Sequence, residues 1–202
     1  ADFDGNNNAV IETLLTNNGV LTSNTANIKG NVTNNNKLTL NSNNDVFDNT
    51  INGSGDLILN GVMTANKTIS QKSIINNGTF TSSAENIKTS VTNKAELNLS
   101  GGTLNATVSG GKTNITGNVV LASSSNIASS AVNVAENKSL TIAAGSSWNN
   151  AISGKGTTIF GAGFNGSNNA VIETLLTNNG VLTTDTANIK GNVNNNNKLT
   201  LN

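Results

Sequence analysis

Short triplets with an aliphatic residue on each side of a polar one recur along the chain. Clear cases are LTL at 38–40, LNL at 97–99 and LTI at 140–142. Successive side chains of an extended strand point to opposite faces, so the outer residues of each triplet would enter a core while Thr39 and Asn98 face water. The pattern predicts short strands that are buried on one side.

These strands follow clusters of Asn, Gly and Lys at a regular spacing. The residues that open them are Val20, Leu38, Leu57, Thr79, Leu97, Val119, Leu140, Thr157 and Val181. From first to last there are eight steps in 161 residues, about 20 residues per step. Such spacing, with two or three short strands per step, predicts an all-β fold, a parallel β-helix (β-solenoid) with about 20 residues per coil.

A much longer repeat contains these steps. Residues 8–41 return as residues 169–202 with 31 of 34 positions identical, at an offset of 161. Weaker matches extend the correspondence to residues 1–41 and 162–202. We therefore expect one full repeat of eight coils over 1–161 and the start of the next over 162–202, in one continuous solenoid that is a fragment of a longer array.

Asparagine is unusually abundant, with 43 of 202 residues. It tolerates the left-handed backbone conformation that coil corners need, and stacked Asn side chains can hydrogen-bond from coil to coil. The alternative is an antiparallel hairpin array, because Asn-Gly between short strands is also a strong hairpin signal. The eight-step cycle inside a near-identical long repeat favours stacked coils.

Composition excludes several classes of function. Eleven Lys balance eleven Asp plus Glu, and Arg, His, Cys, Pro and Tyr do not occur. The neutral charge argues against nucleic-acid binding, and the lack of Cys excludes disulfides and thiolate metal sites. The longest apolar run, Val119–Ala122, is far too short to span a membrane.

Candidate acid/base chemistry is sparse without His or Cys. Asp45 and Asp48 could form a carboxylate pair, but a solvated turn is the preferred interpretation. Asp2 and Asp4 in DFDG suggest calcium, yet the second copy reads GFNG and lacks both carboxylates. We therefore predict no enzyme, and no catalytic, cofactor-binding or metal-binding residues.

Three further motifs are assigned to structure. GKGTTIFGAG, which begins at Gly154, lacks the third glycine of a phosphate-binding loop and is expected to form coil corners. Thr79 and Thr81 form a Thr-x-Thr unit of the kind found in ice-binding solenoids, but it does not recur at each step. Trp148, the only Trp, is expected to cap a thin core; the alternative is an exposed binding anchor.

The coil style of NNGVLT, NNGTFTS, NKAELNLSGGTLNATVSGG and ENKSLTIAAG resembles a known family. It is similar to the passenger domains of Gram-negative autotransporter adhesins and to filamentous-haemagglutinin-type secreted proteins. The resemblance implies a right-handed parallel β-helix, export to the bacterial cell surface and a role in adhesion, aggregation or spacing. These residues contain no membrane-anchoring barrel, secretion domain or protease motif that would indicate the export route.

The expected function is a structural or adhesive segment of a large extracellular repetitive protein, such as an adhesin stalk or a biofilm filament. It would act by reach and multivalent contact. Expected partners are other copies, through head-to-tail or lateral contacts, and host or surface ligands. The alternatives are a self-assembling extracellular fibre or sheath protein and, third, a polysaccharide-acting β-helix enzyme.

Overall fold

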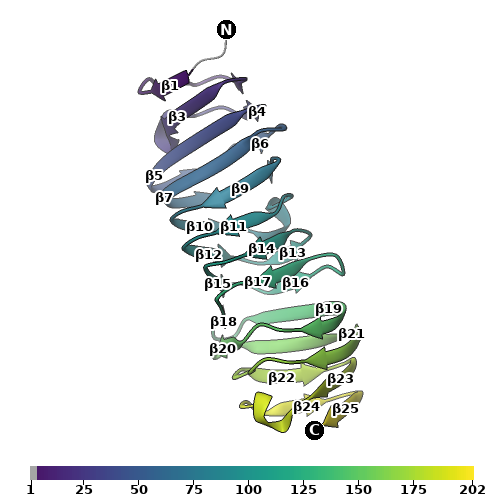
Figure 1. The fold of residues 1–202 in the computed structure, drawn as a ribbon. Coiled ribbons are helices and arrows are strands. Elements are labelled where there is room, and N and C mark those ends of the chain that lie inside the picture. Colours follow the sequence, from purple (N-terminus) through teal and green to yellow (C-terminus); the bar gives the residue numbers. More distant parts are fainter. Residues whose placement is uncertain (1–3) are drawn as a thin grey trace.

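The chain folds into a single rod of stacked turns (Figure 1). The computed structural model describes residues 4–202. It is an all-β solenoid of about 12 turns, with equivalent positions about 17 residues apart. Every strand pairing in the described residues is parallel, which confirms the predicted β-solenoid. The hairpin alternative is wrong, because it requires antiparallel pairs.

Each turn contributes up to three short strands, which join across the corners in a few turns. The strands in the first half of the chain are β1 (Asp4–Asn7), β2 (Leu15–Asn17), β3 (Val20–Asn24), β4 (Val32–Asn34), β5 (Lys37–Phe47), β6 (Ile51–Asn52), β7 (Asp56–Ala65), β8 (Ile69–Ser70), β9 (Ser73–Asn76), β10 (Thr79–Ser82), β11 (Val91–Asn93), β12 (Glu96–Leu99) and β13 (Gly102–Leu104).

The second half has the same organisation. Its strands are β14 (Thr107–Ser109), β15 (Lys112–Ile115), β16 (Val119–Leu121), β17 (Asn126–Ala128), β18 (Ala131–Val134), β19 (Ser139–Trp148), β20 (Ile152–Gly154), β21 (Thr157–Asn168), β22 (Leu175–Asn178), β23 (Val181–Thr184), β24 (Val193–Asn195) and β25 (Lys198–Leu201). The short 3-10 helices are η1 (Thr25–Asn27), η2 (Ala84–Asn86) and η3 (Thr186–Asn188).

The core is a stack of aliphatic side chains along the axis of the rod. On one face, which we call the first face, each core residue sits in register above the equivalent residue of the next turn. This ladder is Leu21, Leu38, Leu57, Ile74, Val91, Val108 and Ile127. All seven are buried. Burial of these side chains and the in-register hydrogen bonds between turns hold the rod together.

The predicted alternation of buried and outward residues is confirmed. Leu38 and Leu40 are fully buried, whereas Thr39 between them is half-buried on the outer surface. Leu97 and Leu99 enclose Asn98 in the same way. One aliphatic pair per strand therefore fills a core only a few side chains wide, as the period of two requires.

The turns are shorter than the predicted coil of about 20 residues. Leu57 pairs with Ile74 in the next turn, whereas the predicted next position, Thr79, lies one face further along the chain. At the predicted steps that end at Val119 and Val181, the predicted position likewise lies one face further along the chain than the residue that pairs. The three faces of a turn carry similar sequences, so a predicted position can fall on the wrong face. Three displacements of one face each add up to one complete turn, which the predicted count therefore omits.

One 161-residue repeat consequently contains nine turns rather than eight. Pairing along the third face gives four steps from Leu15 to Ile87. The next step runs from η2 to Gly102 in β13, since η2 and β13 are in contact. Four more steps reach Leu176, the equivalent of Leu15 in the second copy.

Asparagine serves mainly as a rung between turns. Asn17 donates from Nδ2 to Oδ1 of Asn34 at 2.7 Å, and the pair Asn76 and Asn93 repeats this contact at 2.8 Å. All four side chains are buried. The predicted Asn stacking is thus confirmed, whereas the corner role is rarer: among residues 4–202, the only non-glycine residues with positive φ are Asn44 and Asn137.

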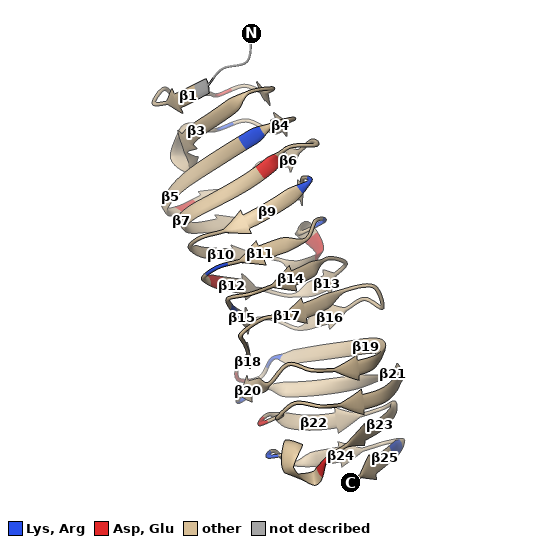
Figure 2. Cartoon of the chain, in the orientation of Figure 1, with Lys and Arg blue, Asp and Glu red and all other residues tan. Residues whose placement is uncertain are grey.

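Charged side chains are sparse and scattered along the rod (Figure 2). Lys112 and Glu96 approach to 3.7 Å on the outer surface, the one ion pair among the described residues. No helix in the described part of the chain is long and apolar enough to cross a membrane.

Candidate functional site

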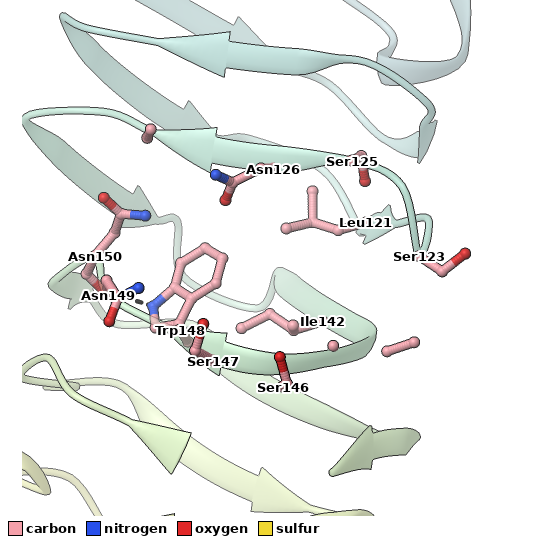
Figure 3. A pocket seen from close by; sticks show the side chains of 13 residues that line it. Leu121, Ser123, Ser125, Asn126, Ile142, Ser146, Ser147, Trp148, Asn149 and Asn150 are labelled. Carbon is pink, nitrogen blue, oxygen red and sulfur yellow. Dashed lines mark hydrogen bonds between the residues drawn. The ribbon is translucent and has the colours of Figure 1, made fainter. Parts of the chain in front are cut away.

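A cleft of about 360 Å³ opens on the first face, where its ladder of strands is interrupted (Figure 3). In the described residues β17 pairs only with β14, and the second half of β19 pairs only with β21. The lining residues are Leu121, Ser123, Ser125, Asn126, Ala128, Ile142, Ala144, Gly145, Ser146, Ser147, Trp148, Asn149 and Asn150. Two successive turns therefore supply the two walls.

The cleft has a local cause in the sequence. Leu121 pairs with Ile142 across 21 residues, the longest step among the pairings in the structure. Gly145, at φ +138°, bends β19 around the corner, and this left-handed conformation is unfavourable for other residues. Trp148 then places a bulky indole where the next two turns carry Asn168 and Thr184. The first-face backbones are kept apart, although β16 and β19 stay paired on the third face.

Hydrogen bonds fix one end of the cleft. Trp148 donates from Nε1 to the carbonyl oxygen of Asn150 at 2.6 Å. The Asn150 amide in turn donates to the carbonyl oxygen of Ile127, in the strand on the opposite wall. Asn149 accepts from Asn169 in the following turn at 2.8 Å. The indole is held rigidly, and a side chain spans the gap that backbone pairing fills elsewhere.

Other polar groups in the cleft are available to a ligand. Asn126 on one wall and Ser146 and Ser147 on the other are exposed, and their side chains make no hydrogen bond within residues 4–202. Figure 3 shows Asn126 facing the strand that carries Ser147 and Trp148. Amides and hydroxyls can each donate and accept, so the two walls offer both kinds of group.

No ionisable side chain lines the cleft. The apolar part of the surface is formed by Leu121, Ile142 and Trp148, which are 3%, 4% and 3% exposed and belong to the core. Trp148 is thus a core aromatic, as the sequence suggested, rather than an exposed anchor. The cleft combines an apolar floor with a neutral, hydroxyl- and amide-bearing rim.

The candidate carboxylates Asp45 and Asp48 accept hydrogen bonds from different partners. Asp45 accepts hydrogen bonds from the Ser42 hydroxyl at 3.1 Å and from the backbone N–H of Asn43 at 3.0 Å, inside its own turn. Asp48 accepts from Asn66 in the next coil at 2.7 Å. Both carboxylates hold turns in place, in keeping with the preferred interpretation.

The remaining motifs have structural positions. Asp4 lies in β1 opposite Val20, and Asp2 lies outside the described residues. Gly154 forms a corner at φ +111°, where a side chain would meet the carbonyl oxygen of Val134 at 2.2 Å. Thr81 accepts a hydrogen bond from Asn98 at 3.1 Å and so belongs to an outer ladder. Within residues 4–202 no group of three or more His, Cys, Asp or Glu residues is placed to hold a metal ion.

The cleft was not predicted from the sequence. Two signals could have indicated it: the longest spacing between paired positions, and the only Trp next to a Gly-Ser-Ser segment. Comparisons with protein-family models, with curated proteins and with solved structures found no significant match to this chain.

Proposed function

We propose that this chain is a non-catalytic structural segment of a large extracellular, surface-attached protein, an adhesin stalk or filament that acts by reach and multivalent contact. The observation that carries the proposal is that the 161-residue repeat restarts in the same structural register. A rod built in this way gains length with each added unit without a new fold.

The two copies are equivalent in detail. Leu15 pairs with Val32 in the first copy, and Leu176 pairs with Val193 in the second. The buried Asn17 rung has its counterpart at Asn178, which donates to Asn195 at 2.8 Å. The helices η1 and η3 also occupy equivalent positions. The sequence repeat is therefore a repeat of contacts, and each unit fits the next.

The outer surface supports a role in contact rather than in chemistry. It is lined with uncharged ladders, such as Asn41, Asn60 and Asn77, whose amides hydrogen-bond from turn to turn at 2.9 Å. Such rigid amide rows fix the surface of the rod before any partner binds, which lowers the entropic cost of association. Adhesion to host or other surfaces is the activity that we propose for this exterior.

Head-to-tail assembly into a fibre is the second candidate. Neighbouring turns in the rod are held by in-register contacts, such as Leu40 fully buried beneath Leu59 of the next turn. End-to-end contact between copies would use the same kind of pairing, and light scattering over a concentration series of the 202-residue chain would detect it.

The spacer role is tested by measuring length. Chains with one, two and three 161-residue units should appear in electron micrographs as unbranched rods that lengthen by about 43 Å per unit, nine turns at about 4.8 Å each. A length that does not increase in proportion to the number of units would contradict the proposal. Protease treatment of intact producing cells, with release of rod fragments, tests the surface location separately.

A further inference from the structure

We propose that the cleft beside Trp148 is a binding site for a neutral sugar, one hexopyranose unit of a glycan. The inference goes beyond the spacer role, because it assigns a ligand class to one specific step of the rod. The inference rests on the proposed adhesive function only for the biological role of the bound sugar. Sugar binding and rod length are measured separately, so either can fail alone.

The shape of the site is the first argument. The interrupted ladder leaves a cavity of about 360 Å³ between two turns, within the range of small-ligand sites. Elsewhere on the first face, backbone pairing between turns closes this space. The walls are fixed by the Trp148 and Asn150 hydrogen bonds, so the cavity exists before a ligand enters.

Charge is the second argument. None of the residues that line the cleft is Asp, Glu or Lys. A phosphate, a carboxylate or an ammonium group placed there would lose hydration without an opposite charge in the lining to compensate. The lining therefore disfavours nucleotides, acidic glycans and metal ions, and it suits a ligand without net charge.

The distribution of polar groups is the third argument. Asn126, Ser146 and Ser147 present unused amide and hydroxyl groups above the apolar floor of Leu121 and Trp148. The hydroxyls of a pyranose ring both donate and accept, and they match these unused groups. The Trp148 nitrogen is already bonded to Asn150, so the ligand's hydrogen bonds fall to the amide and hydroxyl groups of the rim.

The chain provides its own reporter. Trp148 is the only Trp and there is no Tyr, so indole fluorescence arises from the wall of this cleft alone. The probes are two matched pairs: galactose with galacturonic acid, and N-acetylglucosamine with glucosamine. We expect a saturable fluorescence change with at least one of the two neutral sugars, and at least about tenfold weaker binding of its charged counterpart.

Two variants test the location. Ser147→Phe should fill the cleft and abolish the response, whereas Ser109→Phe, at an exposed position of the same face outside the cleft, should leave it unchanged. Asn126→Ala, on the opposite wall, should weaken binding about tenfold. Circular dichroism melts confirm folding, and Asn126→Ala alone decides the outcome if Ser147→Phe does not fold.

The proposal is overturned by any of three results. These are the lack of a saturable response to both neutral sugars, equal binding of the charged counterparts, and unchanged binding by folded Asn126→Ala and Ser147→Phe. Amide chemical shifts of Asn126 and Asn149 in the presence of the same sugars provide a second readout that does not depend on fluorescence.

Discussion

Two steps of the same rod show what keeps a turn closed and what opens it. Between Asn17 and Asn34 the turns are 17 residues apart, and a buried amide rung joins them. On the first face, between β17 and the end of β19, Trp148 fills the interior and the backbones of the two turns do not pair. Bulk alone does not open a turn, because Phe80 is fully buried in a strand that is paired on both sides. The open step combines the indole with a 21-residue spacing between paired positions.

The largest loss of stability is expected when a charge is placed in the core beneath the paired strands. Leu57→Asp places an unpaired charge between Leu38 and Ile74 and should lower the free energy of unfolding by about 4 kcal/mol or more. The matched control, Thr39→Asp on the outer surface, should cost less than about 1 kcal/mol. Denaturant melts followed by circular dichroism compare the two, and equal losses would show that the assignment of inside and outside is wrong.

A smaller effect is expected when one rung is removed. Asn34 accepts from Asn17 and donates to Gln71 at 2.6 Å and to the carbonyl oxygen of Asp56 at 3.1 Å. Asn34→Ala leaves buried partners unsatisfied and should cost about 2–3 kcal/mol. Asn35→Ala removes only an exposed contact to Asn18 and should cost about 0.5 kcal/mol or less.

Melting experiments measure both Asn variants in the same buffer. A loss of stability for Asn34→Ala no larger than that for Asn35→Ala would mean that the buried rungs do not distinguish closed turns from the open one.

The smallest effect is expected in the unsubstituted chain, as a difference in hydrogen exchange between two backbone amides. Val108 lies inside the ladder, with strands paired on both sides, whereas Ile127 lies at the edge of the cleft, where only a side chain reaches its carbonyl oxygen. The Ile127 amide should exchange with solvent deuterium at least about tenfold faster than the Val108 amide. Similar protection of the two amides, measured by NMR, would indicate that the ladder closes in solution.

The sequence predicted the elements of this rod better than their count. The alternation at 38–40 and 97–99 identified strands and their buried sides, because a period of two is a local property. The number of turns depends on which face each strand joins, and similar motifs at Leu57 and Thr79 lie on different faces. That information lies in the pairing between turns, which no local pattern records.

The cleft was missed for a related reason. The sequence predicts that Trp148 caps the core, because a single aromatic more commonly caps a thin core than binds a ligand, and the structure places it there. Its consequence for the neighbouring turn depends on the 21-residue step and on the Asn150 contact with Ile127, which are relations between distant residues. A long spacing beside a single large aromatic is a signal to look for in other solenoids.

The equal contacts of Asn17 with Asn34 and of Asn178 with Asn195 have a consequence for inheritance. A gene rearrangement that deletes or duplicates 161 codons joins a turn to the same neighbour that it had before. Every core contact is restored, and only the length of the rod changes. A deletion of any number of residues that does not correspond to whole turns would instead move outward residues into the core. Length can therefore vary between descendants in whole units while the fold is conserved.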